Sequence, residues 1–141
     1  MATREQLQSL ARLRPREAEA LFAAGFFDGC AYLCGYVVEL ALKATICATL
    51  DVIEYPFEVK APLRTAFRTH DFNDLKLLAG LEGEPSPVNL ALLVNWSIAS
   101  RWRPERRCEP AGTYDRTAAQ EILEAIRVEP NGVLPWQSLH W

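Results

Sequence analysis

Hydrophobic residues along the chain recur at helical spacing far more often than they alternate. Apolar positions repeat every three or four residues in most segments, whereas stretches of period two are few and Asn-Gly occurs only at Asn131-Gly132. A first helix is expected over about residues 3 to 24 and a second over about residues 28 to 50. Gly25 lies between them and is expected to end the first helix, because glycine is common at that position.

Two further helical segments are expected after a proline-containing connection over residues 51 to 62. The first covers about residues 63 to 81, and Asp71 could cap a new helix within it. The second covers about residues 87 to 102, because Pro104 ends or interrupts a helix. Glycines and prolines between the two segments indicate a loop.

The last helix is expected to begin at Asp115 with the sequence TAAQEILEAIRV and to stop at the following proline. Residues 130 to 141 then form a tail, which is predicted to dock on the rest of the protein because exposed tryptophans such as Trp136 and Trp141 would be unusual. The predicted fold is all-α: an up-and-down bundle of four to five antiparallel helices over residues 1 to 129.

The second predicted helix is apolar on nearly every side. In CAYLCGYVVELALKATICATL the charged residues are Glu39 and Lys43 alone. The run is long enough to span a membrane, but two ionised residues near its centre would each cost roughly 2.5 to 3.5 kcal/mol on insertion, and its flanks lack basic anchors. We therefore expect no membrane insertion and interpret the segment as a core helix, covered by its own bundle and by a second subunit.

Composition and charge narrow the classes of function. A chain of 141 residues fits one domain, and a net charge of -3 excludes a protein that coats nucleic acid by bulk charge. The first residues do not resemble a signal peptide, so a cytoplasmic location is expected. No metal or other cofactor is expected, because His70 and His140 are the sole histidines that could join the cysteines as ligands. Four cysteines are expected to be reduced and to serve in packing: Cys30, Cys34, Cys47 and Cys108.

Four segments, taken in order, resemble the HEPN family (higher eukaryotes and prokaryotes nucleotide-binding). They are EALFAAGFFDGCAYLCGYVVELALKA, HDFNDL, NWSIASRWRPERRC and TAAQEILEAI, which together extend over about residues 10 to 128. The resemblance implies an all-α bundle that commonly forms a homodimer and acts on or through RNA or nucleotides. It also implies a stress, defence or toxin–antitoxin setting, often with a small nucleotidyltransferase as the antitoxin partner.

Glu39 and Lys43 match a Glu and a Lys in the second helix of that family. They lie one helical turn apart, in the order that favours an ion pair. The preferred interpretation is a structural, half-buried pair in which each charge neutralises the other. The alternative is that Lys43 contacts a ligand phosphate directly.

The sequence RTAFRTH provides a candidate catalytic pair, Arg64 and His70. Many HEPN members are metal-independent endoribonucleases that carry an Arg, four to six residues, and then a His. Imidazole can exchange a proton with the attacking 2′-hydroxyl or the leaving oxygen, while a guanidinium holds the phosphate oxygens. In those nucleases the motif lies later in the fold, near the fourth helix. The alternative is a capping or packing role for His70 beside Asp71.

The segment RWRPERR is the second candidate site, for binding RNA or nucleotides. Its arginines could hold phosphates while its tryptophan stacks on a base. The alternative is that the arginines pair with acidic residues and form a solvated helix end. The family pattern places Tyr after the last arginine, where this chain has Cys108. The candidate binding residues are Arg101, Trp102, Arg103, Arg106 and Arg107, together with Lys43.

Three classes of function follow from these features. The leading hypothesis is a dimeric HEPN-type protein that acts on RNA or nucleotides, with or without cleavage. The second is a non-enzymatic binding subunit for a partner such as a small nucleotidyltransferase. The third is a helical scaffold without a ligand.

Overall fold

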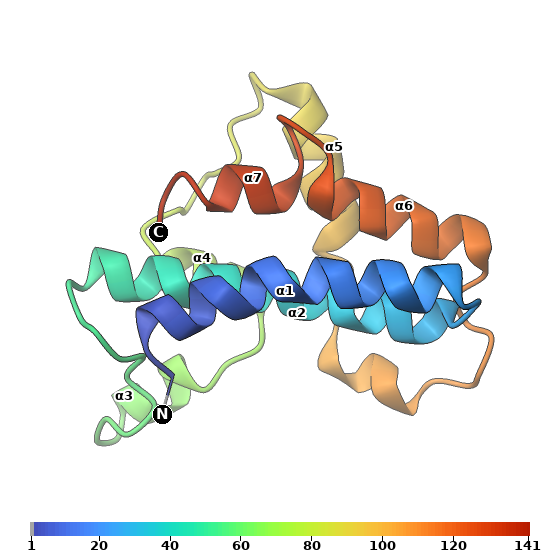
Figure 1. The fold of residues 1–141 in the computed structure, drawn as a ribbon. Coiled ribbons are helices and arrows are strands. Elements are labelled where there is room, and N and C mark those ends of the chain that lie inside the picture. The colour runs from blue at the N-terminus through green and yellow to red at the C-terminus, as the bar shows by residue number, and fades with distance from the viewer. Residues whose placement is uncertain (1) are drawn as a thin grey trace.

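The computed structural model describes residues 2–141, and this part of the chain is all-helical (Figure 1). The predicted all-α bundle is confirmed, although the chain forms more and shorter helices than expected. The elements are α1 (Arg4–Ala23), α2 (Phe27–Thr49), α3 (Leu63–Phe67), α4 (Phe72–Leu78), α5 (Leu90–Ala99), the 3-10 helix η1 (Pro104–Cys108), α6 (Arg116–Arg127) and α7 (Val133–Gln137).

Local signals set the ends of the first two helices close to their predicted positions. Thr3 and Gln6 form a capping box at the start of α1, in which each side chain binds the other residue's backbone N–H at 3.2 and 2.9 Å. Gly25 has a φ of 85°, a left-handed conformation that glycine adopts without strain. The chain therefore reverses at Gly25 and α2 begins two residues later.

The segment over 63 to 81 is divided into two helices, and the predicted cap at Asp71 is confirmed. Asp71 caps α4, because its Oδ1 accepts hydrogen bonds from the backbone N–H groups of Asn73 and Asp74 at 2.8 and 3.2 Å. A capping residue must leave helical geometry, and Asp71 accordingly has an extended backbone. This break places His70 on a short connection rather than on a helix.

The helix predicted over 87 to 102 is shorter at both ends. Asn89 caps α5 through a 3.2 Å hydrogen bond from the N–H of Leu92, and the helix ends at Ala99. Trp102 lies beyond the end of α5 and is 1% exposed. Ending the helix early allows this side chain to enter the core, and Pro104 then starts η1.

The C-terminal segment folds back on the bundle as α7. Trp136 contacts the edge of Trp96 with 5.7 Å between ring centroids, and Gln137 Nε2 donates to the carbonyl of Val38 on α2 at 3.3 Å. Trp141 lies beneath the Arg12 guanidinium at 4.9 Å. The tail thus contacts α1, α2 and α5 instead of leaving its tryptophans in solvent.

Helix α2 is the central element of the bundle. It contacts α1, α4, α5, α6 and α7, and Figure 1 shows α1 lying along it. The helix is long and apolar enough to cross a membrane, with a mean hydropathy of 1.5, but 78% of this apolar stretch is buried inside the protein. Its hydrophobicity is therefore accounted for by the core that it forms.

A glycine on α2 allows Trp102 to pack directly on the helix backbone. A Cβ atom at Gly35 would lie 2.0 Å from the Trp102 ring. On its other side the ring stacks on Phe72 of α4, with 5.7 Å between centroids and 7° between the planes. The contact fixes the start of the η1 segment against both α2 and α4.

We predict that Gly35→Ala destabilises the protein by about 1–3 kcal/mol, because the methyl group overlaps an indole ring that cannot move without opening the core. Urea unfolding followed by circular dichroism measures the change. Gly29→Ala is the matched control on the same helix, since its Cβ would meet only the flexible end of Leu21 at 3.3 Å. Equal stability of the two variants would contradict the proposed packing.

Candidate functional site

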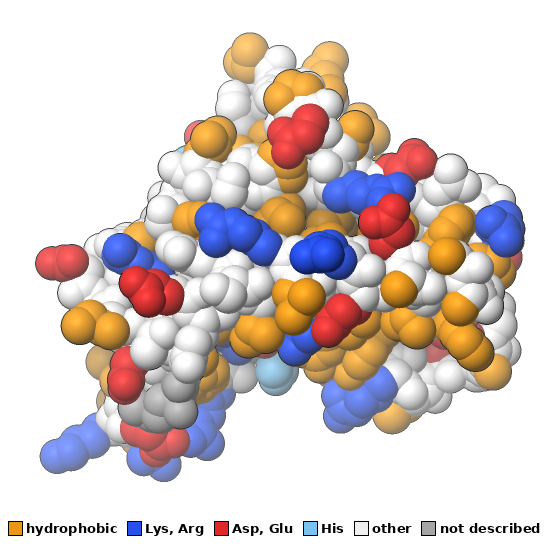
Figure 2. Space-filling model, viewed as in Figure 1, with side chains coloured by type: hydrophobic (Ala, Val, Ile, Leu, Met, Phe, Trp, Pro, Cys, Tyr) orange, Lys and Arg blue, Asp and Glu red, His pale blue; other side chains and the backbone are white. Residues whose placement is uncertain are grey.

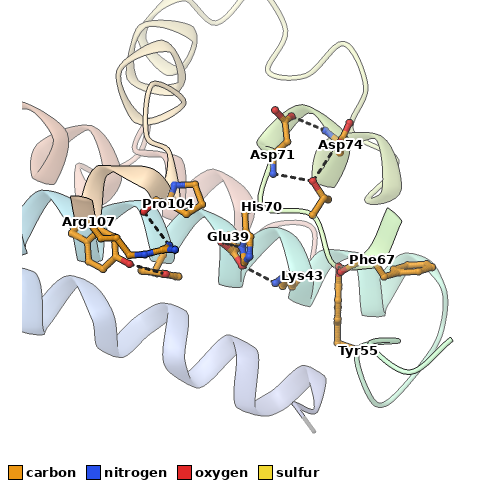
Figure 3. Close-up of polar contacts among 12 residues, drawn as sticks. Glu39, Lys43, Tyr55, Phe67, His70, Asp71, Asp74, Pro104 and Arg107 are labelled. Carbon is orange, nitrogen blue, oxygen red and sulfur yellow. Dashed lines mark hydrogen bonds and ion pairs between the residues drawn. The ribbon is translucent and has the colours of Figure 1, made fainter. Parts of the chain in front are cut away.

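One face of α2 carries four polar side chains in a row, and we call it the polar face. The residues are Tyr32, Tyr36, Glu39 and Lys43, whose spacing of four, three and four places them on one side of a helix. Side chains from the connection before α4 and from η1 reach this same side (Figure 3). The polar face is therefore the place where the two segments singled out in the sequence meet α2.

Glu39 and Lys43 form a buried ion pair at the centre of the face. Lys43 Nζ lies 2.7 Å from Glu39 Oε1, and the two residues are 5% and 4% exposed. The ammonium also lies over the rings of Tyr55 and Phe57, at 5.3 and 5.1 Å. The pair is more deeply buried than the half-buried pair that was expected. Because Lys43 is enclosed by protein, its ammonium is not placed to contact a ligand phosphate, as the alternative interpretation had it.

Glu39 also holds His70. The Nδ1 atom of His70 lies 2.9 and 3.0 Å from the two carboxylate oxygens of Glu39. A carboxylate only accepts hydrogen bonds, so Nδ1 must carry a proton, and in the neutral ring Nε2 then has the free lone pair. The His70 side chain is 51% exposed, and no partner for Nε2 exists within residues 2–141. This arrangement presents a proton acceptor to solvent.

The connection that carries His70 is held by its own hydrogen bonds. Thr69 Oγ1 accepts from the backbone N–H of Asp71 and donates to Asp74 Oδ2, each at 3.1 Å (Figure 3). Because Asp71 also caps α4, the same short motif starts the helix and orients the histidine. His70 thus lies next to a capping aspartate, as the alternative interpretation expected, but its imidazole binds Glu39.

Arg64 and His70 have different partners. Arg64 Nε donates to the carbonyl of Val59 at 3.2 Å, so its guanidinium is bound to the connection before α3. No hydrogen bond joins Arg64 to His70 in the described part of the chain. The partner of His70 is Glu39, which lies 31 positions earlier and was not indicated by the sequence. The one available signal for this contact was the presence of a Glu in an otherwise apolar helix.

The arginines of the RWRPERR segment bind mainly backbone carbonyls. Arg103 donates to the carbonyls of Ser100 and Trp102 at 3.2 and 3.0 Å, and Arg106 to that of Arg101 at 3.1 Å. Arg106 also lies 3.5 Å from Glu109, at the long end of an ion pair. Several of these guanidinium groups are thus already bound within their own segment. The arrangement has features of both the phosphate-binding and the ion-pairing interpretations.

Arg107 is the arginine of this cluster that lies near the polar face. Its Nη1 donates to the carbonyl of Pro104 at 3.3 Å, and the residue is otherwise exposed. Figure 3 shows it on the same side of α2 as His70. Trp102 requires a correction: it is 1% exposed and packed between Gly35 and Phe72, so its ring cannot stack on a base.

Two tyrosines lie between Arg107 and Glu39 along α2. The hydroxyls of Tyr32 and Tyr36 are 3.0 Å apart. Burial raises the pKa of Tyr36 to about 12, with smaller contributions from Tyr32 and from the charge of Glu39, while the Arg107 guanidinium opposes the shift. Tyr36 is therefore a neutral phenol near pH 7.

Metal-binding residues are not gathered in this region. Within residues 2–141, no group of three or more His, Cys, Asp or Glu side chains could hold a metal ion. Cys30, Cys34 and Cys47 are buried, whereas Cys108 is exposed. The chemistry that the site offers is proton transfer by an imidazole and charge stabilisation by guanidinium groups.

Comparison with known proteins assigns no family to the chain. It matches no protein-family model, no curated protein and no solved structure. The site is therefore interpreted from its own residues and their geometry.

We predict that Glu39→Gln destabilises the protein by about 3–5 kcal/mol, because it leaves the Lys43 ammonium buried without a counter-charge. Urea unfolding measures the loss. The double variant Glu39→Gln/Lys43→Met should recover part of it, since the stranded charge is then gone. Glu58→Gln serves as the control, because it breaks the exposed pair with Arg68 and should cost no more than about 1 kcal/mol. A Glu39→Gln loss as small as that of the control would contradict a buried pair.

Proposed function

We propose that this protein is a HEPN-type helical protein that acts on RNA as a metal-independent ribonuclease, using the polar face of α2. The observation that supports the proposal is the His70–Glu39 contact, in which a buried carboxylate orients a half-exposed imidazole. The same arrangement is the one that general acid–base catalysis requires.

The proposed reaction uses the imidazole of His70, the arginines near the polar face, a proton source for the leaving group and the RNA itself. His70 Nε2 removes the proton of a ribose 2′-hydroxyl, and the oxygen attacks the adjacent phosphorus. The bond from phosphorus to the 5′-oxygen breaks, which leaves a 2′,3′-cyclic phosphate and a new 5′-hydroxyl. The proton taken up by the imidazole balances the one that the leaving oxygen acquires from solvent or from a second imidazole.

Glu39 and Lys43 have supporting roles in this reaction. The carboxylate of Glu39 accepts from the Nδ1–H of His70 at 2.9 and 3.0 Å and so fixes the tautomer in which Nε2 has the free lone pair. Lys43 supplies the counter-charge, because its ammonium lies 2.7 Å from the same carboxylate. The buried pair therefore holds the imidazole in position.

Arginine side chains around the site supply positive charge for the phosphate. Figure 2 shows the lower edge of the molecule as a notch between two lobes, with Lys and Arg side chains on both. Arg107 is the arginine nearest the polar face, and most of its N–H groups have no partner within residues 2–141. A guanidinium with free donors can stabilise the charge that develops on the phosphate oxygens.

The family resemblance extends the proposal to assembly and setting. We propose a cytoplasmic homodimer in which two such sites face one another, in a stress, defence or toxin–antitoxin system. A small nucleotidyltransferase is the proposed antitoxin partner. Arg64 remains a candidate for the second arginine of the site, contributed across such a dimer.

The second candidate function is a non-enzymatic binding subunit. Exposed apolar side chains at the start of α5 favour it: Val88 is 92% exposed, Leu90 68% and Val94 57%. Figure 1 shows this helix projecting from the bundle. A partner could cover these residues while the arginines hold RNA or a nucleotide.

We predict that the protein cleaves single-stranded RNA in the presence of a chelator and that His70→Ala lowers the rate by about 10²- to 10⁴-fold, the usual contribution of a general acid–base group. Arg107→Ala should lower it by about 10²-fold, as expected for the loss of one donor to the developing charge. Gel analysis of end-labelled RNA gives the rates, and the products should carry cyclic phosphate ends.

Two variants serve as matched controls for that assay. His140→Ala removes the other histidine and Arg16→Ala an exposed arginine on α1, and both should cleave at the wild-type rate. Cleavage that survives His70→Ala would remove the ribonuclease proposal. Absence of cleavage, combined with RNA binding that is lost in Arg103→Ala/Arg107→Ala and retained in His70→Ala, would favour the binding subunit.

A further inference from the structure

The tyrosine end of the polar face opens into a pocket that shares only Arg107 with the proposed cleavage chemistry. Its volume is about 230 Å³, and it lies where the start of α2, η1 and the loop before α6 meet. Two aromatic rings and several polar groups line it. The ones that matter for recognition are Tyr32, Arg106, Arg107, Glu109 and Tyr114.

Charge balance argues against an inorganic anion as the natural occupant. Two arginines of the lining are matched by two carboxylates, those of Asp28 and Glu109. A phosphate site would need an excess of positive charge, because each carboxylate repels the anion. Asp28 is also committed elsewhere, since it accepts from the N–H groups of Gly112 and Tyr114 at 2.7 and 2.8 Å and so holds the loop in place.

Unused hydrogen-bonding groups point to a neutral ligand that both donates and accepts. Arg106 is already engaged, because it donates to the carbonyl of Arg101 at 3.1 Å and lies over the Tyr114 ring at 5.4 Å. Arg107 is the arginine with free N–H groups, since its one side-chain hydrogen bond within residues 2–141 goes to the carbonyl of Pro104. Within residues 2–141 the side chain of Glu109 makes one polar contact, with Arg106 at 3.5 Å, and it is 38% exposed. The pocket thus places free N–H donors next to a carboxylate that can accept two further hydrogen bonds.

We propose that this pocket binds a guanine base. Guanine presents two acceptors, O6 and N7, on one edge and two donors, N1–H and the N2 amino group, on the adjacent edge. Arginine pairs with O6 and N7 as a fork, and a carboxylate matches the two donors. Adenine, cytosine and uracil each lack at least one of these paired edges. The rings of Tyr32 and Tyr114 line the pocket, and a flat base can stack on Tyr32 or on the face of Tyr114 that the Arg106 guanidinium does not cover.

The position of the pocket relates it to the proposed active site. Tyr32 precedes Glu39 by seven residues, which is two helical turns or about 10 Å along α2. The base, ribose and phosphate of one nucleotide can span this distance. Guanine in the pocket would therefore place its own phosphate near His70. This placement relies on the proposed ribonuclease function, whereas binding of the base can be tested alone.

Calorimetric titration with nucleoside monophosphates tests the pocket. We expect GMP to bind about tenfold or more tightly than IMP, which lacks only the N2 amino group, and more tightly than AMP or CMP. Glu109→Gln should remove most of the gap between GMP and IMP, because an amide cannot accept from both guanine donors. The control is Glu105→Gln, because Glu105 is an exposed acid on η1 that does not line the pocket. This variant should leave the gap between GMP and IMP unchanged.

Several results would overturn the assignment. They are equal affinity for all four nucleotides, no binding of any of them, and a gap between GMP and IMP that persists in Glu109→Gln. Cleavage of guanine-free RNA at the wild-type rate, still dependent on His70, would remove the guanine pocket and leave the ribonuclease intact. GMP binding that depends on Glu109, without any RNA cleavage, would instead remove the ribonuclease and leave the pocket.

Discussion

The carboxylate of Glu39 is the interaction on which the rest of the site depends. It is buried in the most apolar helix of the protein, where an isolated charge would cost several kcal/mol, of the order that breaking a buried pair costs. Lys43 supplies the counter-charge, and the Nδ1–H of His70 donates to the same carboxylate. One side chain thereby joins the core of the bundle to a half-exposed imidazole, so the stability of the core and the geometry of the site are linked.

The second constraint is the direct contact between Trp102 and the backbone of α2. Gly35 leaves room for the indole ring, and Phe72 covers the opposite face of that ring. Phe72 belongs to α4, whose cap lies next to His70, and Trp102 leads into η1 with its arginines. A single aromatic stack therefore holds both segments that flank the polar face. This explains how two short elements with few contacts of their own can keep a defined position relative to α2.

Much of the fold could be predicted from local signals because helices depend on residues close in the sequence. Helical spacing, the caps at Asp71 and Asp115 and the reversal at Gly25 are all short-range features, and the structure contains each of them. One boundary was misplaced where a long-range contact decides it. The predicted helix over 87 to 102 ends early because Trp102 is drawn into the core, where it gains burial that no helical position would provide.

The sequence by itself determined the helical class, the central position of the apolar helix and the pairing of Glu39 with Lys43, since all of these follow from spacing along one helix. Only the tertiary structure decided what that pair touches. His70 reaches Glu39 across 31 positions, and Trp102 turns inward although its neighbours Arg101 and Arg103 are exposed. Such contacts arise from the packing of separate helices, and packing depends on shape and volume that no spacing rule encodes.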